Sequence, residues 1–301
     1  MEGLVEIDID DQGMVMPPKN DKVLLVDADT IAYTTCLNTE VAEEVLGDYM
    51  YTDMEWDAIV NDPMYSEVDG CVYVTDPILA LSKAEDKLQR IMDKTGCSKF
   101  ELHFTGGGKN NFRYKITPNY KANRTGRTPA GLGRLKRDLA EKYKGTIHDG
   151  WEADDYVVYA KLKEPEKYIL CAIDKDVLNS IEGEHFNYYE SALYSKDMHF
   201  QEVSKHTAMT WRYIQTLTGD KTDGIEGLHR VGPKTAEKII AGKFSHGEIW
   251  KAVVEAYKIK GKTEDNAILT LNLVDMRLLT EDKEGKLYIK LRTKEEMDEL
   301  Q

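Results

Sequence analysis

The sequence contains few cysteines and no long apolar run, and each scarcity excludes a class of protein. The cysteines stand far apart, and none forms a CxxC or Cys/His spacing typical of zinc sites; they are Cys36, Cys71, Cys97 and Cys171. We interpret them as reduced thiols in a cytoplasmic protein. No apolar run approaches the roughly 20 residues that a membrane-spanning helix needs. Residues 1–20 hold five acids against Lys19 alone, which is unlike a signal peptide and predicts an acidic flexible tail.

Positive charge is scarce overall, but it is concentrated in one segment. The 301 residues are 41% hydrophobic, enough for an ordinary core, and carry a formal net charge of −14. That balance disfavours nucleic-acid binding, because phosphate contacts come mainly from Lys and Arg. Residues 109–144, however, hold 11 Lys and Arg against only Asp138 and Glu141. This uneven distribution of charge says more about nucleic-acid binding than the net charge does.

Short apolar runs alternate with helical patterns in the first two thirds of the chain. The runs at 23–26, 100–104, 145–148 and 168–173 predict strands, and residues 77–92 and 151–162 predict helices. The alternation predicts an α/β domain over 21–200 around a mainly parallel sheet flanked by helices. Residues 38–76 are acidic and weakly periodic, and we treat them as an insertion of unknown role. Residues 201–301 predict a helical C-terminal portion.

Acidic residues stand at strand ends or in turns, at four places along the chain. They are Asp27, the group Glu152, Asp154 and Asp155, the pair Asp174 and Asp176, and the pair Asp220 and Asp223. The carboxyl ends of parallel strands converge on one edge of a sheet, where ligands generally bind. Carboxylates gathered there repel one another unless cations neutralise them. Oxygen ligands without His or Cys suit Mg²⁺ or Mn²⁺ rather than zinc.

Each group of acids also has a simpler interpretation. Glu152, Asp154 and Asp155 could cap a helix and complement its positive end, and Asp174 and Asp176 could be ordinary turn residues after a strand. The pair at 220 and 223 could belong to a loop between two glycines. The occurrence of four such groups at successive strand or loop ends favours a metal site.

Two further segments suit contact with a phosphate backbone. In 118–124, Tyr120, Lys121 and Arg124 lie within about one helical turn, and the two cations would share a face if the segment is helical. A solvated basic loop is the alternative. In 224–236, Gly227 and Gly232 permit close backbone approach and the second precedes a proline-started helix, whose N–H groups could hold a phosphate. An ordinary helix–turn–helix packing motif is the alternative there.

Taken together, these segments resemble the flap endonuclease and 5′–3′ exonuclease family, which includes bacteriophage exonucleases and the 5′-nuclease domain of bacterial DNA polymerase I. The resemblance spans about 22–240 and rests on Val26-Asp27, Phe112-Arg113, Tyr120-Lys-Ala-Asn-Arg124, Glu152-Ala-Asp-Asp155, Asp174-Lys-Asp176, Gly219-Asp-Lys-Thr-Asp223 and the hairpin 224–236. It implies a PIN-like fold whose C-terminal portion carries a helix–two-turn–helix (helix-hairpin-helix-like) DNA-binding motif. The compact length is most similar to the phage enzymes, which implies the host cytoplasm as the location.

The resemblance also implies an activity and a set of site residues. The implied activity is cleavage of phosphodiester bonds near the 5′ ends of flapped, nicked or branched duplex DNA, and RNA–DNA hybrid is a further substrate class. The implied enzyme is a monomer that acts in replication, primer removal or DNA degradation. Two Mg²⁺ ions, replaceable by Mn²⁺, would be held by Asp27, Glu152 and Asp154 in one site and by Asp174, Asp176 and Asp223 in the other, with Asp155 and Asp220 close by.

The same resemblance assigns roles to basic and glycine residues. Lys121 and Arg124 would stabilise charge on the phosphate, while Tyr120 would stack on a nucleobase. Residues 106–144 would form an arch or gateway for the 5′ strand. The hairpin would grip duplex backbone together with a monovalent cation such as K⁺. The expected DNA contacts are Lys109, Arg113, Arg127, Gly227, Arg230, Gly232, Lys234 and Thr235.

Two departures from the family pattern affect these expectations. The family often has an Asp at the end of the second strand, where this chain has Gly106. The first metal site is therefore expected to have one ligand fewer. The hairpin has Arg230 where the family commonly has Gly, and this added positive charge could contact phosphate directly.

Two rival functions remain open at the level of sequence. Asp27-Ala-Asp29-Thr30 resembles the DxDxT motif of haloacid-dehalogenase-like phosphatases, in which Asp27 would be phosphorylated and Asp29 would be the general acid. That interpretation leaves the basic segment and the hairpin unexplained. A non-enzymatic DNA-end binder would need those two segments but not eight acids.

Overall fold

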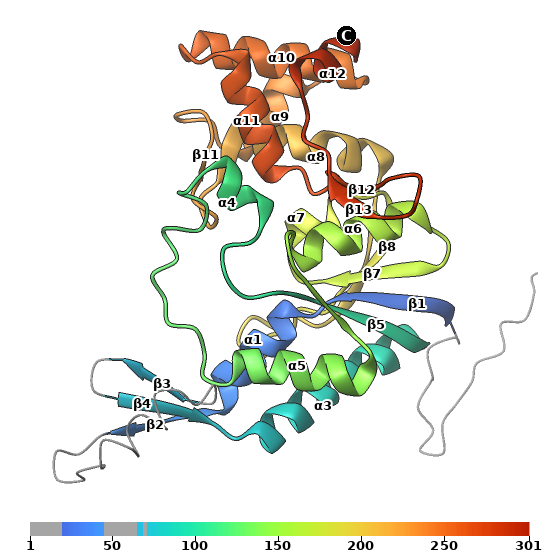
Figure 1. Ribbon diagram of the computed structural model, residues 1–301. Coiled ribbons are helices and arrows are strands. Elements are labelled where there is room, and N and C mark those ends of the chain that lie inside the picture. Colours follow the sequence, from blue (N-terminus) through green and yellow to red (C-terminus); the bar gives the residue numbers. More distant parts are fainter. Residues whose placement is uncertain (1–19, 45–64, 69–70, 301) are drawn as a thin grey trace, which may run out of the picture.

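A computed structural model describes residues 20–44, 65–68 and 71–300 of the chain. The predicted acidic tail and the middle of the predicted insertion lie outside the described residues. The part of the chain that is described builds an α/β body with a helical portion stacked on one side of it (Figure 1).

The centre of the α/β body is a six-stranded sheet in the order β6-β5-β1-β7-β8-β9. All neighbouring pairs are parallel except β8 and β9. The strands are β1 Asn20–Asp27, β5 Cys97–Thr105, β6 Thr146–His148, β7 Tyr168–Ala172, β8 Gly183–Asn187 and β9 His199–Val203. Leu24, Leu25 and Val26 of the central strand β1 are at most 1% exposed, as expected for a strand covered on both faces. The four strands predicted from sequence are confirmed, whereas β8 and β9 were not foreseen.

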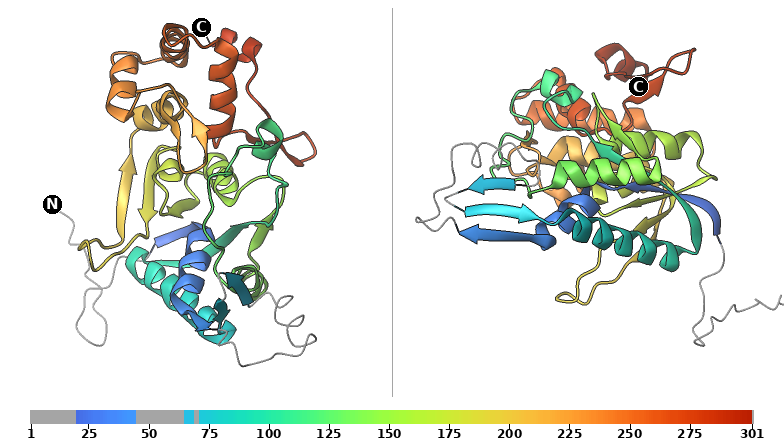
Figure 2. Two further views of the ribbon diagram at one scale, coloured as in Figure 1. Left: turned by 90° about the vertical axis from the view of Figure 1, so that its left-hand side faces the viewer. Right: turned by 60° about the horizontal axis from the view of Figure 1, so that its bottom comes forward.

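Helices cover both faces of this sheet (Figures 1 and 2). On one face lie α1 Asp29–Thr39, α3 Pro77–Thr95 and α5 Leu132–Tyr143, whose apolar side chains meet those of β1 and β5 in one core. On the other face lie α6 Ala153–Lys163 and α7 Lys175–Leu178, which share a second core with β7. The predicted helices at 77–92 and 151–162 are thus present, with ends shifted by one to three residues. The fold class predicted from sequence is confirmed.

The described part of the insertion is a three-stranded antiparallel sheet in the order β2-β4-β3. Its strands are β2 Glu40–Glu44, β3 Tyr65–Val68 and β4 Cys71–Thr75. It projects from the end of α1, beside the segment that leads to α5 (Figure 1). Arg127 of that segment forms an ion pair with Glu40 and lies 3.6 Å from the ring centroid of Tyr73. The insertion therefore holds the basic segment in place.

The C-terminal portion consists of helices around a core of its own. Its elements are α8 Lys205–Thr218, β10 Gly219–Asp220, β11 Ile225–Glu226, α9 Pro233–Ile240, α10 His246–Ile259, α11 Glu264–Val274, β12 Leu279–Glu281, β13 Leu287–Ile289 and α12 Lys294–Glu299. Tyr213, Trp250 and Tyr257 fill that core. Pro233 starts α9, as the sequence predicts. The hairpin β12–β13 was missed, because its strands are only three residues long.

A buried carboxylate ties the C-terminal elements together. Asp275, which follows α11 and is 1% exposed, forms ion pairs with Arg212 at 3.1 Å, Arg277 at 3.4 Å and Arg292 at 3.2 Å. Burial alone would raise the pKa of Asp275, but the three guanidinium groups outweigh it and hold the pKa well below the usual range. One carboxylate thus joins α8 to the segments before and after the β12–β13 hairpin.

We predict that Asp275→Asn lowers the free energy of unfolding by roughly 3–5 kcal/mol, because it leaves three guanidinium groups around a neutral amide. Since the folded-state pKa is depressed, the contribution is present above the ordinary carboxyl pKa of ~3.9 and is lost as the pH falls below it. Urea unfolding of the unsubstituted protein and the Asp275→Asn variant at pH 7 and pH 3 measures this difference in stability. Glu255→Gln, at an exposed position of α10, is the control. Equal stability of the two proteins at pH 7 would contradict the prediction.

Candidate active site

The carboxyl edge of the sheet brings the predicted acids together. Asp27 is the last residue of β1, Glu152 precedes α6 after β6, and Asp174 precedes α7 after β7. Because β5, β1 and β7 run parallel as neighbours, their ends meet at one edge. Asp220 and Asp223 enter from the β10–β11 hairpin of the helical portion, so the candidate site lies between the two parts of the molecule.

A buried salt bridge stands behind this edge. Arg113, in the short helix α4 Phe112–Ile116, donates two hydrogen bonds of 2.7 Å to the carboxylate of Asp155. Its Nε also donates to the Leu273 carbonyl at 2.8 Å, and Arg113 and Asp155 are 2% and 0% exposed. The expected roles of these two residues therefore need correction. Both Asp155 oxygens are occupied by Arg113, and Arg113 lies too deep to contact DNA.

Tyr120 also differs from the expectation. The residue is 1% exposed, and its hydroxyl lies 2.8 Å from a Glu152 carboxylate oxygen and 3.0 Å from one of Asp223, so that its single proton is shared between these two acceptors. A side chain so enclosed cannot stack on a nucleobase. It instead links the acid that precedes α6 to the acid of the β10–β11 hairpin, and so sets the separation of the two groups of carboxylates.

The two expected phosphate-binding cations lie at the site but are engaged with its acids. Lys121 is ion-paired with Glu152, with its Nζ also 3.8 Å from Asp223, and Arg124 is ion-paired with Asp223. The segment is a series of turns rather than a helix: Lys121 has a φ of 55°, and its N–H donates to the Asp223 carbonyl at 2.8 Å. Burial opposes ionisation of Glu152, but Lys121 and Arg113 outweigh it and lower the pKa of this carboxyl.

Asp27 and Asp154 have no such partner among the described residues. Burial, together with the Asp29 carboxylate, raises the pKa of Asp27 to about 8. Burial and the neighbouring Glu152 raise the pKa of Asp154 well above its usual range. Ionising either group therefore costs free energy that a cation at this edge would recover.

Of the acids that follow β7, Asp174 has no ion-pair partner among the described residues, and Asp176 pairs only with the exposed ammonium of Lys175 at 3.3 Å. Burial and the Asp174 carboxylate raise the pKa of Asp176 to about 6. The surrounding protein and the Asp220 carboxylate also raise the pKa of Asp174. The side chains of Asp174 and Asp220 accept backbone N–H groups of their own turns at 2.8 Å each. Turn geometry thus fixes both carboxylates, as the simpler interpretation from sequence proposed, and it leaves their charge unbalanced.

In this conformation, the described residues contain no group of three or more His, Cys, Asp and Glu side chains gathered tightly enough to hold a metal ion. The ion pairs give the physical reason, because Lys121 and Arg124 draw Glu152 and Asp223 toward themselves. The donor set still fits a hard divalent cation: it consists of carboxylate oxygens, several of them buried without a positive partner.

The departure at Gly106 has a steric basis. Its N–H donates to the His148 carbonyl at 2.8 Å, and a Cβ at this position would lie 2.6 Å from the same oxygen. The chain therefore tolerates no side chain at Gly106 without moving β6. The nearby Asp29, the general acid in the phosphatase interpretation, accepts the Thr105 N–H at 3.1 Å and pairs with Lys136 at 2.6 Å. Its carboxylate is thereby held away from general-acid chemistry.

The hairpin 224–236, which we call the glycine hairpin, contains glycines that pack against neighbouring backbone and residues that are exposed. Gly227 packs against the backbone of Thr218 and Gly219, where a Cβ would lie 2.1 Å from Thr218, so its role is internal. Gly232 precedes α9 in open space. Arg230 adopts a φ of 59°, in the left-handed region that favours glycine. The exposed side chains of this segment include Glu226, His229, Arg230, Lys234 and Thr235.

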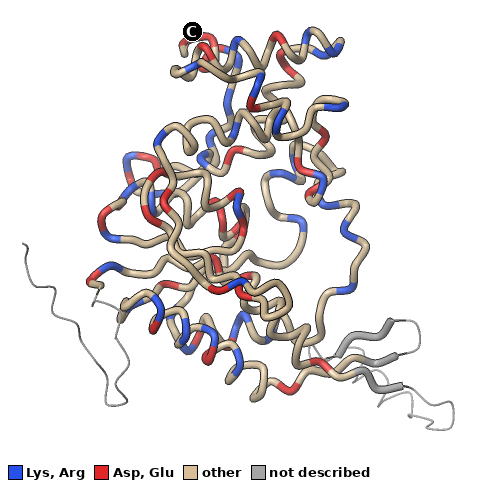
Figure 3. The backbone as a smooth tube through the Cα atoms, turned by 180° about the vertical axis from the view of Figure 1, so that it is seen from behind, with Lys and Arg blue, Asp and Glu red and all other residues tan. Residues whose placement is uncertain are grey.

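Most cations of the basic segment pair with acids of the same chain. The pairs are Arg113–Asp155, Lys121–Glu152, Arg124–Asp223, Arg127–Glu40, Arg134–Asp138, Lys136–Asp29 and Lys142–Glu85. Among the described residues, Lys109, Lys115, Arg137 and Lys144 have no ion-pair partner. Blue positions follow the extended segment on one side of the molecule (Figure 3). Arg127, expected to contact DNA, is instead held by Glu40.

Comparison with known proteins finds similar sequences and similar folds. No family model matches the chain. A flap endonuclease Xni of Colwellia psychrerythraea is 28% identical over 182 residues, covering 56% of this chain and 60% of that protein. A DNA polymerase I of Mycobacterium bovis is 28% identical over 168 residues, covering 51% of this chain and 18% of that protein. The match thus spans less than two thirds of either relative.

Solved structures show the same fold. A T5 5′-exonuclease with bound zinc ions superposes with a TM-score of 0.57 at 16% identity, covering 85% of this chain and 90% of that one. A mutant of T5 5′-exonuclease gives a TM-score of 0.51 at 16% identity, over 65% and 82% of the two chains. The chain is related to the flap endonucleases and 5′–3′ exonucleases. No helix in the described residues is long and apolar enough to cross a membrane.

Sequence reasoning missed several residues that shape the site of this flap-endonuclease relative. The Asp29–Lys136 pair and the contact of Asp29 with Thr105 join residues far apart in sequence, and no motif announces them. Trp211 and Gln215 of α8 also went unnoticed, although both line a cavity beside Asp176 and Asp220. Their spacing of four residues on one helix was the available signal.

We predict opposite stability changes for two adjacent isosteric substitutions in metal-free protein. Asp155→Asn breaks the buried pair with Arg113 and should lower the free energy of unfolding by roughly 3–5 kcal/mol. Asp154→Asn removes a half-buried carboxylate that has no ion-pair partner among the described residues, and it should raise the free energy of unfolding. Urea unfolding at pH 7 in EDTA measures both, and each variant serves as the other's control. A loss of stability in Asp154→Asn comparable to that in Asp155→Asn would refute the distinction.

A pH dependence follows from Asp27. Its folded-state pKa of about 8 exceeds the ordinary value of ~3.9, so the folded state binds the proton more tightly than the unfolded chain. The stability of metal-free protein should therefore decrease as the pH rises from about 4 to about 8. Asp27→Asn should make this decrease shallower, which unfolding curves at pH 5, 6, 7 and 8 would reveal. An unchanged slope would show that Asp27 is already ionised in the folded protein.

Proposed function

We propose that this protein is a metal-dependent 5′ nuclease that hydrolyses phosphodiester bonds near the 5′ ends of flapped or duplex DNA. One observation carries the proposal: carboxylates at the ends of β1, β6 and β7 meet the β10–β11 acids beside Lys121 and Arg124. Among the described residues, Asp27, Asp154 and Asp174 of this group have no ion-pair partner. The flap endonuclease and DNA polymerase I relatives support the same activity.

Two groups of acids would hold two divalent ions, with Mg²⁺ as the natural ion and Mn²⁺ as a substitute. Asp27, Glu152 and Asp154 form one group, and Asp174, Asp176, Asp220 and Asp223 form the other. The raised pKa values of four of these acids support the assignment, because a bound cation favours the charged forms; they are Asp27, Asp154, Asp174 and Asp176. Bound ions of this kind activate water and stabilise a leaving oxygen during phosphodiester hydrolysis. Asp155 is left out, since Arg113 holds it.

Lys121 and Arg124 would act on the phosphate only after leaving the acids. With ions bound, Glu152 and Asp223 no longer need the two cations, which lie 18% and 50% exposed at the site. Both side chains can then turn toward a phosphodiester, where a cation stabilises developing negative charge. In the metal-free protein these side chains serve as internal counter-ions.

DNA would be gripped at a distance from the acids. Arg230, Lys234 and Thr235 are exposed around the start of α9, where they can contact duplex phosphates. Lys109 is exposed at the Gly106–Gly108 turn, beside the site. The proposal also includes a monovalent cation such as K⁺ at the glycine hairpin, RNA–DNA hybrid as a further substrate, and a monomeric protein.

The two rival functions fit the site less well. A phosphatase using Asp29 as general acid conflicts with the hydrogen bonds and ion pair that hold this carboxylate. A non-enzymatic DNA-end binder gives no reason for buried, uncompensated acids at the centre of the site, since such groups repel phosphate.

The decisive experiment is cleavage of a 5′-labelled flap duplex with and without Mg²⁺. We expect Mg²⁺-dependent release of short 5′ fragments, which also shows whether the cut is endonucleolytic or exonucleolytic. Asp174→Asn should abolish cleavage while DNA binding persists, because it removes a metal ligand from a folded protein. Glu255→Gln should cleave like the unsubstituted protein. Absence of cleavage in both Mg²⁺ and Mn²⁺ by folded protein would exclude the nuclease.

A further inference from the structure

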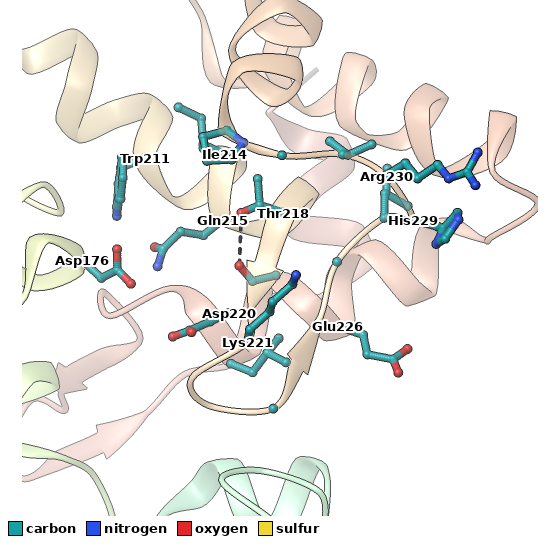
Figure 4. Close-up of a pocket in the computed structure, with 18 of the residues that line it drawn as sticks. Asp176, Trp211, Ile214, Gln215, Thr218, Asp220, Lys221, Glu226, His229 and Arg230 are labelled. Atoms are coloured by element: carbon teal, nitrogen blue, oxygen red, sulfur yellow. Dashed lines mark hydrogen bonds between the residues drawn. The ribbon is translucent and has the colours of Figure 1, made fainter. Parts of the chain in front are cut away.

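A cavity of about 1160 Å³ lies between α7, α8 and the glycine hairpin (Figure 4). Asp176 and Asp220 line one end of it, and Arg230 lies at the other (Figure 4). Trp211 and Gln215 project into it from α8. Since the two residues are four positions apart, they lie on the same face of this helix. In Figure 4 both side chains point toward Asp176.

Three polar atoms around this end of the cavity are buried without a hydrogen-bond partner among the described residues. They are Asp176 Oδ1, Gln215 Oε1 and Trp211 Nε1. Asp176 and Gln215 are 9% and 6% exposed. Asp176 Oδ1 does form an ion pair with the 73% exposed ammonium of Lys175 at 3.3 Å, and that ammonium lies 5.4 Å from the Trp211 ring centroid. Gln215 Oε1 and Trp211 Nε1 therefore remain the two atoms without a polar partner in the described part of the chain. Buried polar groups in proteins almost always have hydrogen-bond partners, so two that lack one beside a carboxylate point to a polar ligand for this end of the cavity.

The chemistry of the three groups restricts that occupant. The indole N–H can only donate a hydrogen bond, the carboxylate can only accept one, and the glutamine amide can do both. Water bound to a divalent cation satisfies all of them, because such water donates strongly to an amide oxygen and its own oxygen accepts from an indole N–H. An apolar ligand would satisfy none.

We infer that Trp211 and Gln215 are positioning residues that hold the water shell of a divalent cation at Asp176. This inference rests on the proposed function, because it assumes that Asp176 belongs to a metal site. It adds two side chains of α8 to that site, neither of which is an expected ligand. Groups that orient a metal's ligands and waters typically change metal affinity or activity by 10–100-fold when they are removed.

Mn²⁺ binding to the full-length, metal-free protein tests the inference without relying on activity. Titration calorimetry gives the Mn²⁺ affinity, and water-proton relaxation reports the water molecules held on bound Mn²⁺. Gln215→Met keeps the side-chain length but removes the amide, and Trp211→Phe keeps an aromatic ring but removes the N–H. We expect each to weaken Mn²⁺ binding about tenfold and to alter the relaxation signal. Gln89→Met, on the exposed face of α3, should match the unsubstituted protein.

The outcomes separate this inference from the proposed function. If the unsubstituted protein binds Mn²⁺ and cleaves a flap duplex while both α8 variants bind Mn²⁺ normally, the inference is wrong and the nuclease stands. If the unsubstituted protein neither binds Mn²⁺ nor cleaves, both fail. Thermal unfolding identifies a variant that does not fold, in which case the other variant decides. Weaker binding in a folded variant, with cleavage restored by higher Mn²⁺, supports the positioning role.

Discussion

The buried pair of Arg113 and Asp155 is the constraint on which the candidate site depends. One guanidinium joins three separate segments: α4, which carries it, the first turn of α6 and the end of α11 through the Leu273 carbonyl. Asp155 in turn accepts the Glu152 N–H at 3.0 Å. The planar, always charged guanidinium suits this two-pronged contact, which a lysine ammonium could not reproduce. The helical portion and the sheet are thus held in register at the point where their acids meet.

Internal ion pairs explain why the basic segment 109–144 does not form a uniformly positive surface on this acidic protein. Glu40, Asp223 and Asp29 all pair with cations of 109–144, and each of these acids fastens a different part of the chain to this segment. The contact with Glu40 gives the insertion a structural role that its sequence did not suggest. Most cations of 109–144 therefore stabilise the structure around the site. The cations without an ion-pair partner among the described residues, such as Lys109, are the ones available to bind a polyanion.

The fold could be predicted from sequence because its signals are local. Apolar runs such as 168–173 mark strands, and acids directly after them mark the carboxyl edge, so the meeting of Asp27, Glu152 and Asp174 followed from topology. The errors at Arg113, Asp155 and Tyr120 have one cause. Each residue belongs to a motif shared with a nuclease family, but its burial and its partner depend on contacts 32 to 160 residues away. Local pattern carries no information on such contacts.

Gly106 shows why the site cannot be understood as a family site with one ligand deleted. A carboxylate introduced there would need a Cβ that collides with the His148 carbonyl, and the Gly106 N–H is bonded to that same oxygen. The backbone of β5 and β6 is therefore closed over the position. Behind it, His103 and His148 stack as a buried pair with a ring-nitrogen separation of 3.0 Å, and burial lowers the pKa of each, to about 3 and about 4. These neutral rings brace the strand ends against each other. Asp27 and Asp154 are thereby left with fewer neighbouring carboxylates than in a site with an acid at this position, which lowers the electrostatic repulsion that the metal-free fold must bear.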